Sequence, residues 1–345
     1  MPEDSTAQIN FIELRQKAIS PPLISHIYTA DPSAHVFNGK IYIYPSHDVD
    51  AGEAFDDLGS HFAMEDYHVI SMDDPQGAAK DNGVALQVSD VPWAEKQMWA
   101  PDASEKNGSY YLFFPAKNYD GIFKIGVAIS RSPTGPFVPQ PEAIKGSFSI
   151  DPAVFRDDDG SYYMYFGGIW GGQLQRWRTG TFNPANEKNP VAHLPAEHEP
   201  ALCAKVAKLS DDLLGFAELP KDVLIIDGQG RPLLQGDNDR RFFEGSWMHK
   251  YKGKYYFSYA TGDTHFICYA IAASPYGPFT YAGRILNPVV GWTSHHSIVE
   301  FNSEWYLFYH DSSLSNGVTH LRNIKVTKLL YDKNGFIVTI DPYSK

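Results

Sequence analysis

The stretch Met248-His-Lys-Tyr-Lys-Gly-Lys-Tyr-Tyr-Phe-Ser-Tyr259 contains a strand-forming run, a polar turn built on Gly253, and a second, aromatic-rich run. A short glycine turn between two runs of strand-forming residues predicts a β-hairpin. The same pattern returns in four other places: His35–Tyr44, Ala103–Phe114, Ala153–Phe166 and Ile298–Tyr309. Hairpins that recur at intervals of roughly 50 to 90 residues are typical of a β-propeller. The sequence therefore predicts an all-β fold, a five-bladed β-propeller.

A second repeat follows two of these hairpins. Ser132-Pro-Thr-Gly-Pro-Phe137 and Ser274-Pro-Tyr-Gly-Pro-Phe279 share the pattern Ser-Pro-x-Gly-Pro-Phe, and each comes directly after an alternating, strand-like run. Proline and glycine interrupt regular structure, so each copy is interpreted as the outer turn of a blade. Two independent periodicities make a chance resemblance between the copies improbable.

The chain shows no composition break that would mark a linker between domains. We expect a single propeller catalytic domain over residues 25–345, preceded by an N-terminal arm over residues 1–24 with a short helix near residues 9–18. The least regular region is 178–241. We interpret it as the outer strands of the third blade with a long loop, including a strand over residues 204–209 and a helical patch over residues 211–217.

Charge and composition exclude some classes of partner. The formal net charge of −12 argues against binding to nucleic acid or to an anionic membrane surface. No stretch approaches the ~20 apolar residues of a membrane span, and residues 1–20 lack the basic and apolar segments of an export signal. We therefore expect a cytoplasmic protein with no membrane partner. Cys203 and Cys268 are expected to be free thiols rather than a disulfide.

A titratable residue lies upstream of each hairpin turn. The innermost strand of every propeller blade runs along the central channel, so equivalent positions in the five blades converge at one mouth of that channel. The expected ring consists of Asp31, Asp102, Asp151, Glu244 and His295. Burying like charges together costs folding free energy, so a ring of carboxylates indicates a functional site. A lone acid beside a proline is usually a turn residue, and Asp102 fits that structural interpretation best.

The three remaining acids suit the cleavage of a glycosidic bond. That reaction uses one carboxylic acid to protonate the leaving oxygen and one carboxylate on the other side of the sugar. A third acid can hold the pKa of the proton donor up. Aromatic side chains beside the acids would stack on a sugar ring, and the candidates are Trp99, Trp170 and Phe243. The alternative for each tryptophan is an ordinary place in the core.

In their order along the chain, these motifs resemble glycoside hydrolase family 43. Each motif alone is weak, whereas the ordered set is specific and spans nearly the whole sequence. The set comprises Ala30-Asp31-Pro32, Trp99-Ala100-Pro101-Asp102, Asp151-Pro152-Ala153-Val154-Phe155, Glu244-Gly245 and His295-His296-Ser297.

The resemblance implies a five-bladed propeller and an inverting mechanism. Carried over by position, it makes Asp31 the general base, Asp151 the residue that tunes the pKa of the acid, and Glu244 the general acid. It also makes His295 the histidine beneath the site, which in many members binds a central divalent cation, often Ca²⁺, through water. Arg322 resembles the arginine that lies beside the sugar and the carboxylates.

The segment Phe166–Arg176 resembles the branch of β-xylosidases that also accept α-L-arabinofuranosides. Such an enzyme releases xylose from the non-reducing end of β-1,4-xylo-oligosaccharides. Many xylosidases of the family close their pocket with a large C-terminal β-sandwich, whereas this sequence ends soon after the fifth hairpin. We therefore expect closure by loops such as residues 48–67, or by a partner subunit in a homo-oligomer. His296 adjoins His295, and alternation along a strand allows only one of them to face the channel.

Two other readings of the sequence stay open at this point. The first is another five-bladed glycosidase, such as an arabinan-directed enzyme or a retaining β-fructosidase, although the Asn-Asp-Pro-Asn and Glu-Cys elements of the fructosidases are missing. The second is a sugar-binding propeller without catalysis. Propellers of that kind usually repeat one pocket in every blade, whereas equivalent positions here carry different residues. The sequence leaves the preference between xylose and arabinofuranose open.

Overall fold

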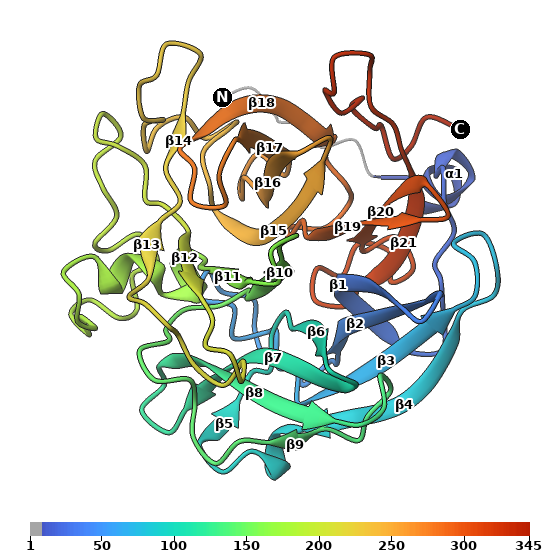
Figure 1. Ribbon diagram of the computed structural model, residues 1–345. Helices are drawn as coiled ribbons and strands as arrows, with labels where there is room; N and C mark the ends of the chain where they lie inside the picture. Colours follow the sequence, from blue (N-terminus) through green and yellow to red (C-terminus); the bar gives the residue numbers. More distant parts are fainter. Residues whose placement is uncertain (1–8) are drawn as a thin grey trace, which may run out of the picture.

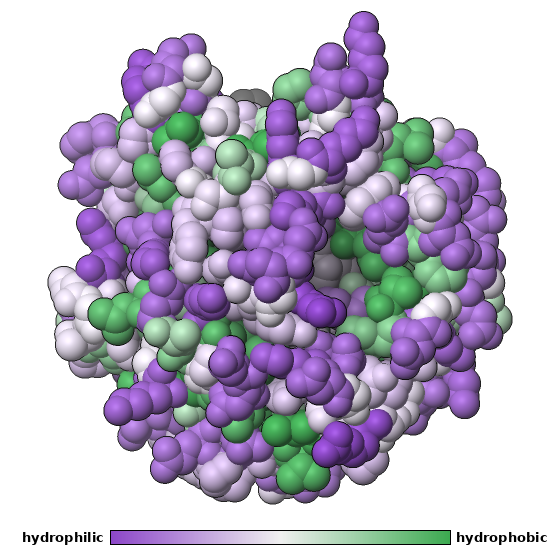
Figure 2. Space-filling view, in the orientation of Figure 1, coloured by the Kyte–Doolittle hydropathy of each residue, from purple (hydrophilic) through white to green (hydrophobic). Residues whose placement is uncertain are grey.

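A computed structural model describes residues 9–345, which form five small sheets arranged around a central axis (Figure 1). Each sheet is one blade, and in blades one, three and five neighbouring strands follow one another in chain order. The predicted all-β, five-bladed propeller is confirmed. The arm predicted over residues 1–24 lies partly outside the described residues, because these begin at residue 9. Figure 2 shows the same face of the molecule, which is hollowed near the centre, where the innermost strands meet in Figure 1.

The first two blades contain nine strands. Blade one consists of β1 (Tyr28–Phe37), β2 (Lys40–Asp48), β3 (Asp66–Met72) and β4 (Lys80–Gln87). Blade two consists of β5 (Ala94–Lys96), β6 (Asp102–Lys106), β7 (Ser109–Asn118), β8 (Phe123–Ser130) and β9 (Val138–Pro139).

The last three blades complete the ring. Blade three consists of β10 (Ala153–Arg156), β11 (Tyr162–Phe166), β12 (Lys205–Lys208) and β13 (Lys221–Asp222). Blade four consists of β14 (Ile225–Ile226), β15 (Glu244–Tyr251), β16 (Lys254–Ala260), β17 (Ile267–Ala272) and β18 (Phe279–Leu286). Blade five consists of β19 (His296–Phe301), β20 (Glu304–Asp311) and β21 (Asn323–Leu329). The helical elements are α1 (Phe11–Lys17) and the 3₁₀ turns η1 (Val88–Asp90), η2 (Trp170–Gly172) and η3 (Leu174–Trp177).

All five predicted hairpins are present. Four of them turn through two residues that both have positive φ, as a type I′ turn requires. These turn pairs are Asn38–Gly39, Asn107–Gly108, Lys252–Gly253 and Asn302–Ser303. The hairpin of blade three has a longer loop, between Arg156 and Tyr162. The backbone twist of a type I′ turn matches that of the flanking strands, which explains the recurrence of Asn and Gly at these places.

The second sequence repeat forms outer turns, as predicted. Gly135 lies between β8 and β9, and Gly277 lies between β17 and β18. Their φ values are +79° and +78°. A Cβ atom at these positions would lie 3.1 Å from Phe137 and 2.7 Å from Phe279. The glycine is needed both for its left-handed backbone and because the phenylalanine of the same motif packs against it.

The region 178–241 differs in two ways from the expectation. The strand expected over residues 204–209 is present as β12, but β14 pairs in parallel with β18 and therefore belongs to blade four rather than to blade three. The helical patch expected over residues 211–217 is wrong. Serine and aspartate compete for local backbone groups, and here Ser210 Oγ accepts from Gly215 N while Leu213 takes a φ of +61°. The result is a turn.

The ring closes between blade five and blade one. The chain around the start of β1 runs beside the start of β21, where Leu23 N donates to Ile324 O and Thr29 N donates to Arg322 O. One core cluster joins the two blades, with Ile24, Ala34, Ile41, Ile43, Ile70 and Met72 from the first and Phe301, Tyr306, Phe308 and Ile324 from the last. Helix α1, close to the expected range 9–18, begins at the cap Asn10 and lies near the C-terminus, where Lys345 N donates to Lys17 O.

Two smaller expectations can be compared with residues 9–345. Cys203 and Cys268 are both free thiols, as predicted. In this part of the chain, no helix is long and apolar enough to cross a membrane.

The turn chemistry yields a prediction about stability. Ser303 has a φ of +64° at a position where three other hairpins carry glycine. A left-handed backbone costs a residue with a Cβ atom about 1–2 kcal/mol. We expect Ser303→Gly to raise the midpoint of thermal unfolding and the matched reverse change, Gly253→Ser, to lower it. Both positions are exposed, so packing is unaffected. Shifts of the same sign in the two variants would contradict this explanation.

Candidate active site

A cavity opens where the innermost strands meet, and it gathers most of the residues predicted from the sequence. Four of the five expected ring residues line it: Asp31, Asp151, Glu244 and His295. The candidate sugar-binding residues line it as well, namely Trp99, Trp170, Phe243 and Arg322. The sequence prediction of one central site, built from all five blades, agrees with this placement.

The placement of Asp102 in the ring is wrong. When the inner strands are aligned on the proline that follows Asp31 and Asp151, the equivalent residue in blade two is Ala100, and Ala100 lines the cavity. Asp102 lies two positions further along and is buried. It accepts from the backbone of Ala103 and Val154 and contacts His35 Nε2 at 2.6 Å. Asp102 therefore has a structural role outside the cavity, which agrees with its interpretation from the sequence.

Backbone irregularities turn the acids toward the cavity. Asp31 and Asp151 have φ values of +50° and +55°, a region that few residues with a side chain adopt. The β1–β2 ladder slips in register between Ala30 and Ser33, and the β15–β16 ladder slips after Glu244. Bulges of this kind redirect a side chain away from the regular alternation of a strand. A backbone irregularity, either a positive φ or a slip in register, therefore accompanies each of the three acids.

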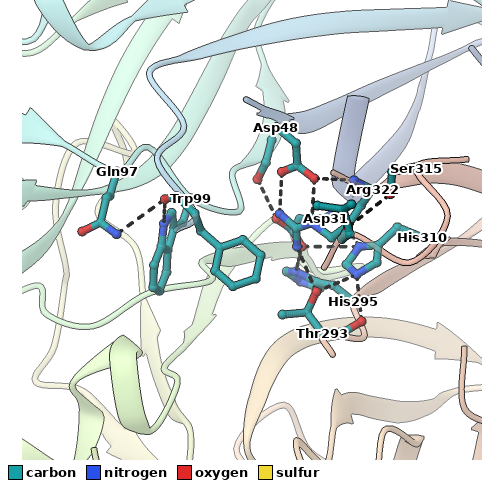
Figure 3. A network of polar contacts seen from close by, with 12 residues as sticks. Asp31, Asp48, Gln97, Trp99, Thr293, His295, His310, Ser315 and Arg322 are labelled. Carbon is teal, nitrogen blue, oxygen red and sulfur yellow. Dashed lines mark hydrogen bonds and ion pairs between the residues drawn. The ribbon is translucent and has the colours of Figure 1, made fainter. Parts of the chain in front are cut away.

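Arg322 connects two carboxylates beneath the cavity (Figure 3). Its Nε and Nη2 donate to the two oxygens of Asp48 at 2.8 and 2.7 Å, and its Nη1 donates to Asp31 Oδ1 at 2.9 Å. All three side chains are buried. A bidentate pair of this kind is strong and fixes the plane of the guanidinium. Arg322 therefore holds Asp31 in place; a contact with the sugar remains a prediction.

Two histidines and a serine also contact Asp31. His295 Nδ1 lies 3.3 Å from Asp31 Oδ1, and Asp31 N donates to His310 Nδ1 at 3.0 Å. Ser46 Oγ donates to Asp31 Oδ2 at 2.7 Å. Burial would raise the pKa of Asp31, but the charge of Arg322 and the contact with His295 outweigh it and hold this pKa well below its ordinary value. Asp31 is therefore ionised.

The other two acids are shifted in the opposite direction. Burial, joined by the charge of Asp31 and opposed by His295, raises the pKa of Asp151 to about 6. Burial and the charges of Asp151 and Asp31 raise the pKa of Glu244 well above its ordinary value. Asp151 Oδ2 accepts from Gly245 N at 2.9 Å, so Asp151 lies against the residue that follows Glu244. The site thus combines an ionised carboxylate with a carboxylic acid.

The two adjacent histidines face opposite sides, as alternation requires. His295 lines the cavity, whereas His296 is buried in the sheet, with its Nε2 at 2.6 Å from Ser258 Oγ. Gly245 lies beside the His295 ring, because a Cβ atom there would be 3.2 Å from His295 Cδ2. His295 is therefore the residue of this pair that can act in the cavity.

The loop between β2 and β3, residues 49–65, forms one wall of the cavity, and we refer to it as the lid loop. Its lining residues include Phe55, Asp56, Asp57, Gly59, His61, Phe62 and Met64. Trp99 Nε1 donates to Phe62 O at 2.8 Å and joins the lid loop to blade two. His61 is buried, and its Nε2 has no hydrogen-bond partner among the described residues. Closure by this part of the chain agrees with the expectation for residues 48–67.

The glycine-rich segment after β11 packs tightly against the site. A Cβ atom at Gly168 would lie 2.6 Å from Ile150, and one at Gly171 would lie 2.5 Å from the Leu58 carbonyl oxygen of the lid loop. Only glycine permits these approaches. Trp170, which lies between these glycines, stands 5.4 Å from the Phe243 ring and 5.6 Å from the Trp292 ring. The three rings form an apolar wall of the cavity.

Comparison with known proteins agrees with this arrangement of residues. The family model of Glycosyl hydrolases family 43 matches residues 23–190. A Xylosidase/arabinosidase 43A of Humicola insolens is 59% identical over 324 residues, which cover 93% of this chain and 99% of that protein. The chain belongs to glycosyl hydrolase family 43. A Xylosidase/arabinosidase of Bacteroides ovatus is 57% identical over 92% of this family-43 hydrolase and 97% of that protein.

Solved structures extend the likeness to the fold. A family-43 β-xylosidase/α-arabinofuranosidase from a compost microbial metagenome, described in complex with xylotriose and in a calcium-free form, superposes with a TM-score of 0.92. It is 62% identical over 94% of this hydrolase and 98% of that chain. The β-xylosidase RS223 superposes with a TM-score of 0.90 at 56% identity, over 93% and 98% of the two chains.

Among the residues of the family-43 site that sequence reasoning missed are Asp48 and His310. Both lie at the far end of the second strand of a hairpin, whereas only the entrances of the first strands were considered. In an antiparallel pair, the end of the second strand lies beside the start of the first: Asp48 pairs with Tyr28, and Tyr309 pairs with His296. Polar residues at the ends of β2 and β20 were the signal that could have identified both.

Proposed function

We propose that this hydrolase releases xylose from the non-reducing end of β-1,4-xylo-oligosaccharides with inversion of the anomeric centre, and that it also removes α-L-arabinofuranosyl units. The observation that carries the proposal is the cavity in which Asp31 is held ionised while Glu244 is held protonated. Supporting it, relatives at 56–59% identity are named xylosidase/arabinosidase or β-xylosidase, and a structure at 62% identity is described with xylotriose.

The proposed mechanism assigns one role to each acid. Glu244 gives its proton to the leaving glycosidic oxygen, and ionised Asp31 takes a proton from the attacking water on the opposite side of the sugar. Asp31 Oδ2 accepts from Ser46 and has a second lone pair free for that water. Asp151 keeps the pKa of Glu244 high through its charge. Trp99, Trp170 and Phe243 exclude water and provide the apolar faces of the sugar site.

A divalent cation, which we propose to be Ca²⁺, fits beside this site with His295 as its protein ligand. His295 Nδ1 faces Asp31 at 3.3 Å, which leaves Nε2 as the nitrogen free to bind a cation. In the described part of the chain, no group of three histidine, cysteine or carboxylate donors converges at His295. Water would therefore complete an oxygen-rich shell of the kind calcium prefers. A bound cation would supply positive charge that stabilises ionised Asp31 and lowers its pKa.

The experiment that tests the function follows the first product by NMR. With xylotriose as substrate, we expect xylose as the released sugar, appearing first as its α-anomer because the β-bond is inverted. Hydrolysis of nitrophenyl β-D-xyloside and α-L-arabinofuranoside is expected alongside it. A β-anomer as the first product would exclude inversion, and hydrolysis within the chain rather than at its end would exclude the exo mode.

The two catalytic roles can be separated by leaving-group dependence. Asp31→Ala is expected to lose activity on every substrate, because no other group activates water. Glu244→Ala is expected to lose about 10²–10⁴-fold on xylobiose but much less on dinitrophenyl xyloside, whose leaving group needs little protonation. Exposed Glu300→Ala serves as the matched control with unchanged rates. Equal losses of Glu244→Ala on both substrates would remove its role as the acid.

The pKa shift of Glu244 predicts a change in the pH profile. Hydrolysis requires protonated Glu244, so the alkaline limb of the profile reports its pKa. Asp151→Asn removes a negative charge that raises this pKa, and the limb is therefore expected to move to lower pH, by on the order of one unit. Exposed Asp120→Asn removes a charge outside the cavity lining and is expected to leave the limb in place. A shift to higher pH would contradict the assignment.

Removal of the cation provides the fourth test of this site. Prolonged chelation is expected to lower turnover, and added Ca²⁺ is expected to restore it. His295→Ala is expected to lose both activity and the response to Ca²⁺, whereas exposed His198→Ala keeps both. Full activity of a chelated enzyme that elemental analysis finds free of metal would leave His295 with a structural role only. The homo-oligomer expected from the sequence can be measured on the same preparation by light scattering.

A further inference from the structure

A second group of potential metal ligands lies at the base of the lid loop, outside the cavity. His47 is the second-last residue of β2, and Asp66 and His68 are in β3, so the three residues flank the two ends of residues 49–65. In the described part of the chain this is the one group of three or more such side chains whose ligand atoms all lie within 4.8 Å of one another. We propose that His47, Asp66 and His68 bind a zinc ion, with water completing its shell, and that the ion clamps the base of the lid loop.

The backbone places these three side chains on one face of the sheet. If the β2–β3 register is continued from Ile43↔Ile70 past Pro45, His47 falls opposite Asp66. His68 follows Asp66 by two positions, and such residues share a face of a strand. Asp48, the next residue after His47, points to the other face and binds Arg322. The ligand group is therefore separated from the catalytic network by the sheet itself.

The distances suit a tetrahedral ion. His47 Nδ1 lies 2.7 Å from Asp66 Oδ1, and His68 Nε2 lies 3.9 Å from the same oxygen. Ligand atoms at 2.0–2.2 Å from a tetrahedral zinc ion stand about 3.4 Å apart, between these two values. Side-chain movements of a few tenths of an ångström would bring these two pairs close to that spacing, and the ligand atoms of His47 and His68 lie within 4.8 Å of each other. The His47 and His68 rings already stand 4.7 Å apart, at 62° to each other.

Asp81 provides independent support for a metal role. His68 Nδ1 is 2.9 Å from Asp81 Oδ1, so the Nδ1 proton is held by this carboxylate and Nε2 presents its lone pair toward Asp66. Zinc-binding histidines usually have such a carboxylate behind them, because it fixes the tautomer and the orientation of the ring. The other Asp81 oxygen is 2.9 Å from His26 Nε2, which in turn orients Asp81.

Access and ligand type favour zinc over calcium. The side chains of His47, Asp66 and His68 are 18%, 24% and 12% exposed, so an ion and its water molecules can reach them. Two imidazole nitrogens and one carboxylate form a donor set for zinc, whereas calcium takes oxygen ligands almost throughout. The ion proposed here is therefore different in place and in kind from the cation proposed at His295.

Titration of the chelator-treated, full-length enzyme with zinc chloride in a calorimeter tests the site. We expect one zinc ion per chain, bound equally well in the presence of excess Ca²⁺ and in the His295→Ala variant. His47→Ala and His68→Ala are expected to lose this binding, whereas His198→Ala keeps it. Asp81→Asn is expected to weaken it by about 10–100-fold. Circular dichroism and thermal unfolding show that each variant is folded.

Three outcomes would contradict the proposal, two for the zinc site and one for the clamp. The zinc site is refuted if the native enzyme shows no saturable binding, or if His47→Ala and His68→Ala bind as tightly as the native enzyme. The clamp is tested by hydrogen exchange, in which zinc is expected to slow exchange in residues 49–65 of the native enzyme and not in His68→Ala. Zinc binding without slower exchange in the lid loop would refute the clamp. None of these measurements depends on the proposed substrate, so their failure is distinct from a failure of the proposed function.

Discussion

The buried contact of Arg322 with Asp31 and Asp48 is the interaction on which the rest of the structure depends. Arg322 directly precedes the last strand of blade five, and both carboxylates belong to blade one, so the contact joins the two ends of the ring. Removing one member of such a buried pair typically costs about 3–5 kcal/mol, because the remaining charge has no partner. The same guanidinium keeps Asp31 ionised. Closure of the fold and the charge state of the site therefore depend on one side chain.

This arrangement also explains how three acids can share one cavity. Arg322 contacts Asp31 directly but only weakly offsets the shift of Glu244, which burial and the neighbouring carboxylates dominate. The pKa of Asp31 is consequently lowered and that of Glu244 is raised. The pKa of Asp151, about 6, lies between the two. Chemically similar residues at equivalent positions of a repeat thus acquire different protonation states from their surroundings rather than from their type. The distinction between acid and base is a property of the whole ring.

Much of the fold could be predicted from the sequence because the signals are local. Asn-Gly turns between strand-forming runs fix the hairpins, and Ser-Pro-x-Gly-Pro-Phe marks the outer turns. The site residues Asp31, Asp151, Glu244 and His295 could be found because the repeat makes them equivalent. Asp102 was misplaced because alignment on the turn, rather than on the proline, shifted blade two by two residues. Asp48 and His310 were missed because only the entrances of the first strands were considered. The parallel pairing of β14 with β18 was missed because these strands are far apart in sequence and leave no local pattern.

The parallel pairing of β14 with β18 has a consequence for how the molecule comes apart. The connection out of blade three, after β13, contributes its next strand to the outer edge of blade four before the chain enters the inner strand β15. The outermost strand of blade four is thus formed by residues that precede the first hairpin of that blade. One core cluster also joins residues of blades three and four. The two blades should therefore behave as one cooperative unit of unfolding rather than as successive modules. Although the fold is built from five similar blades, blades three and four are therefore not independent units.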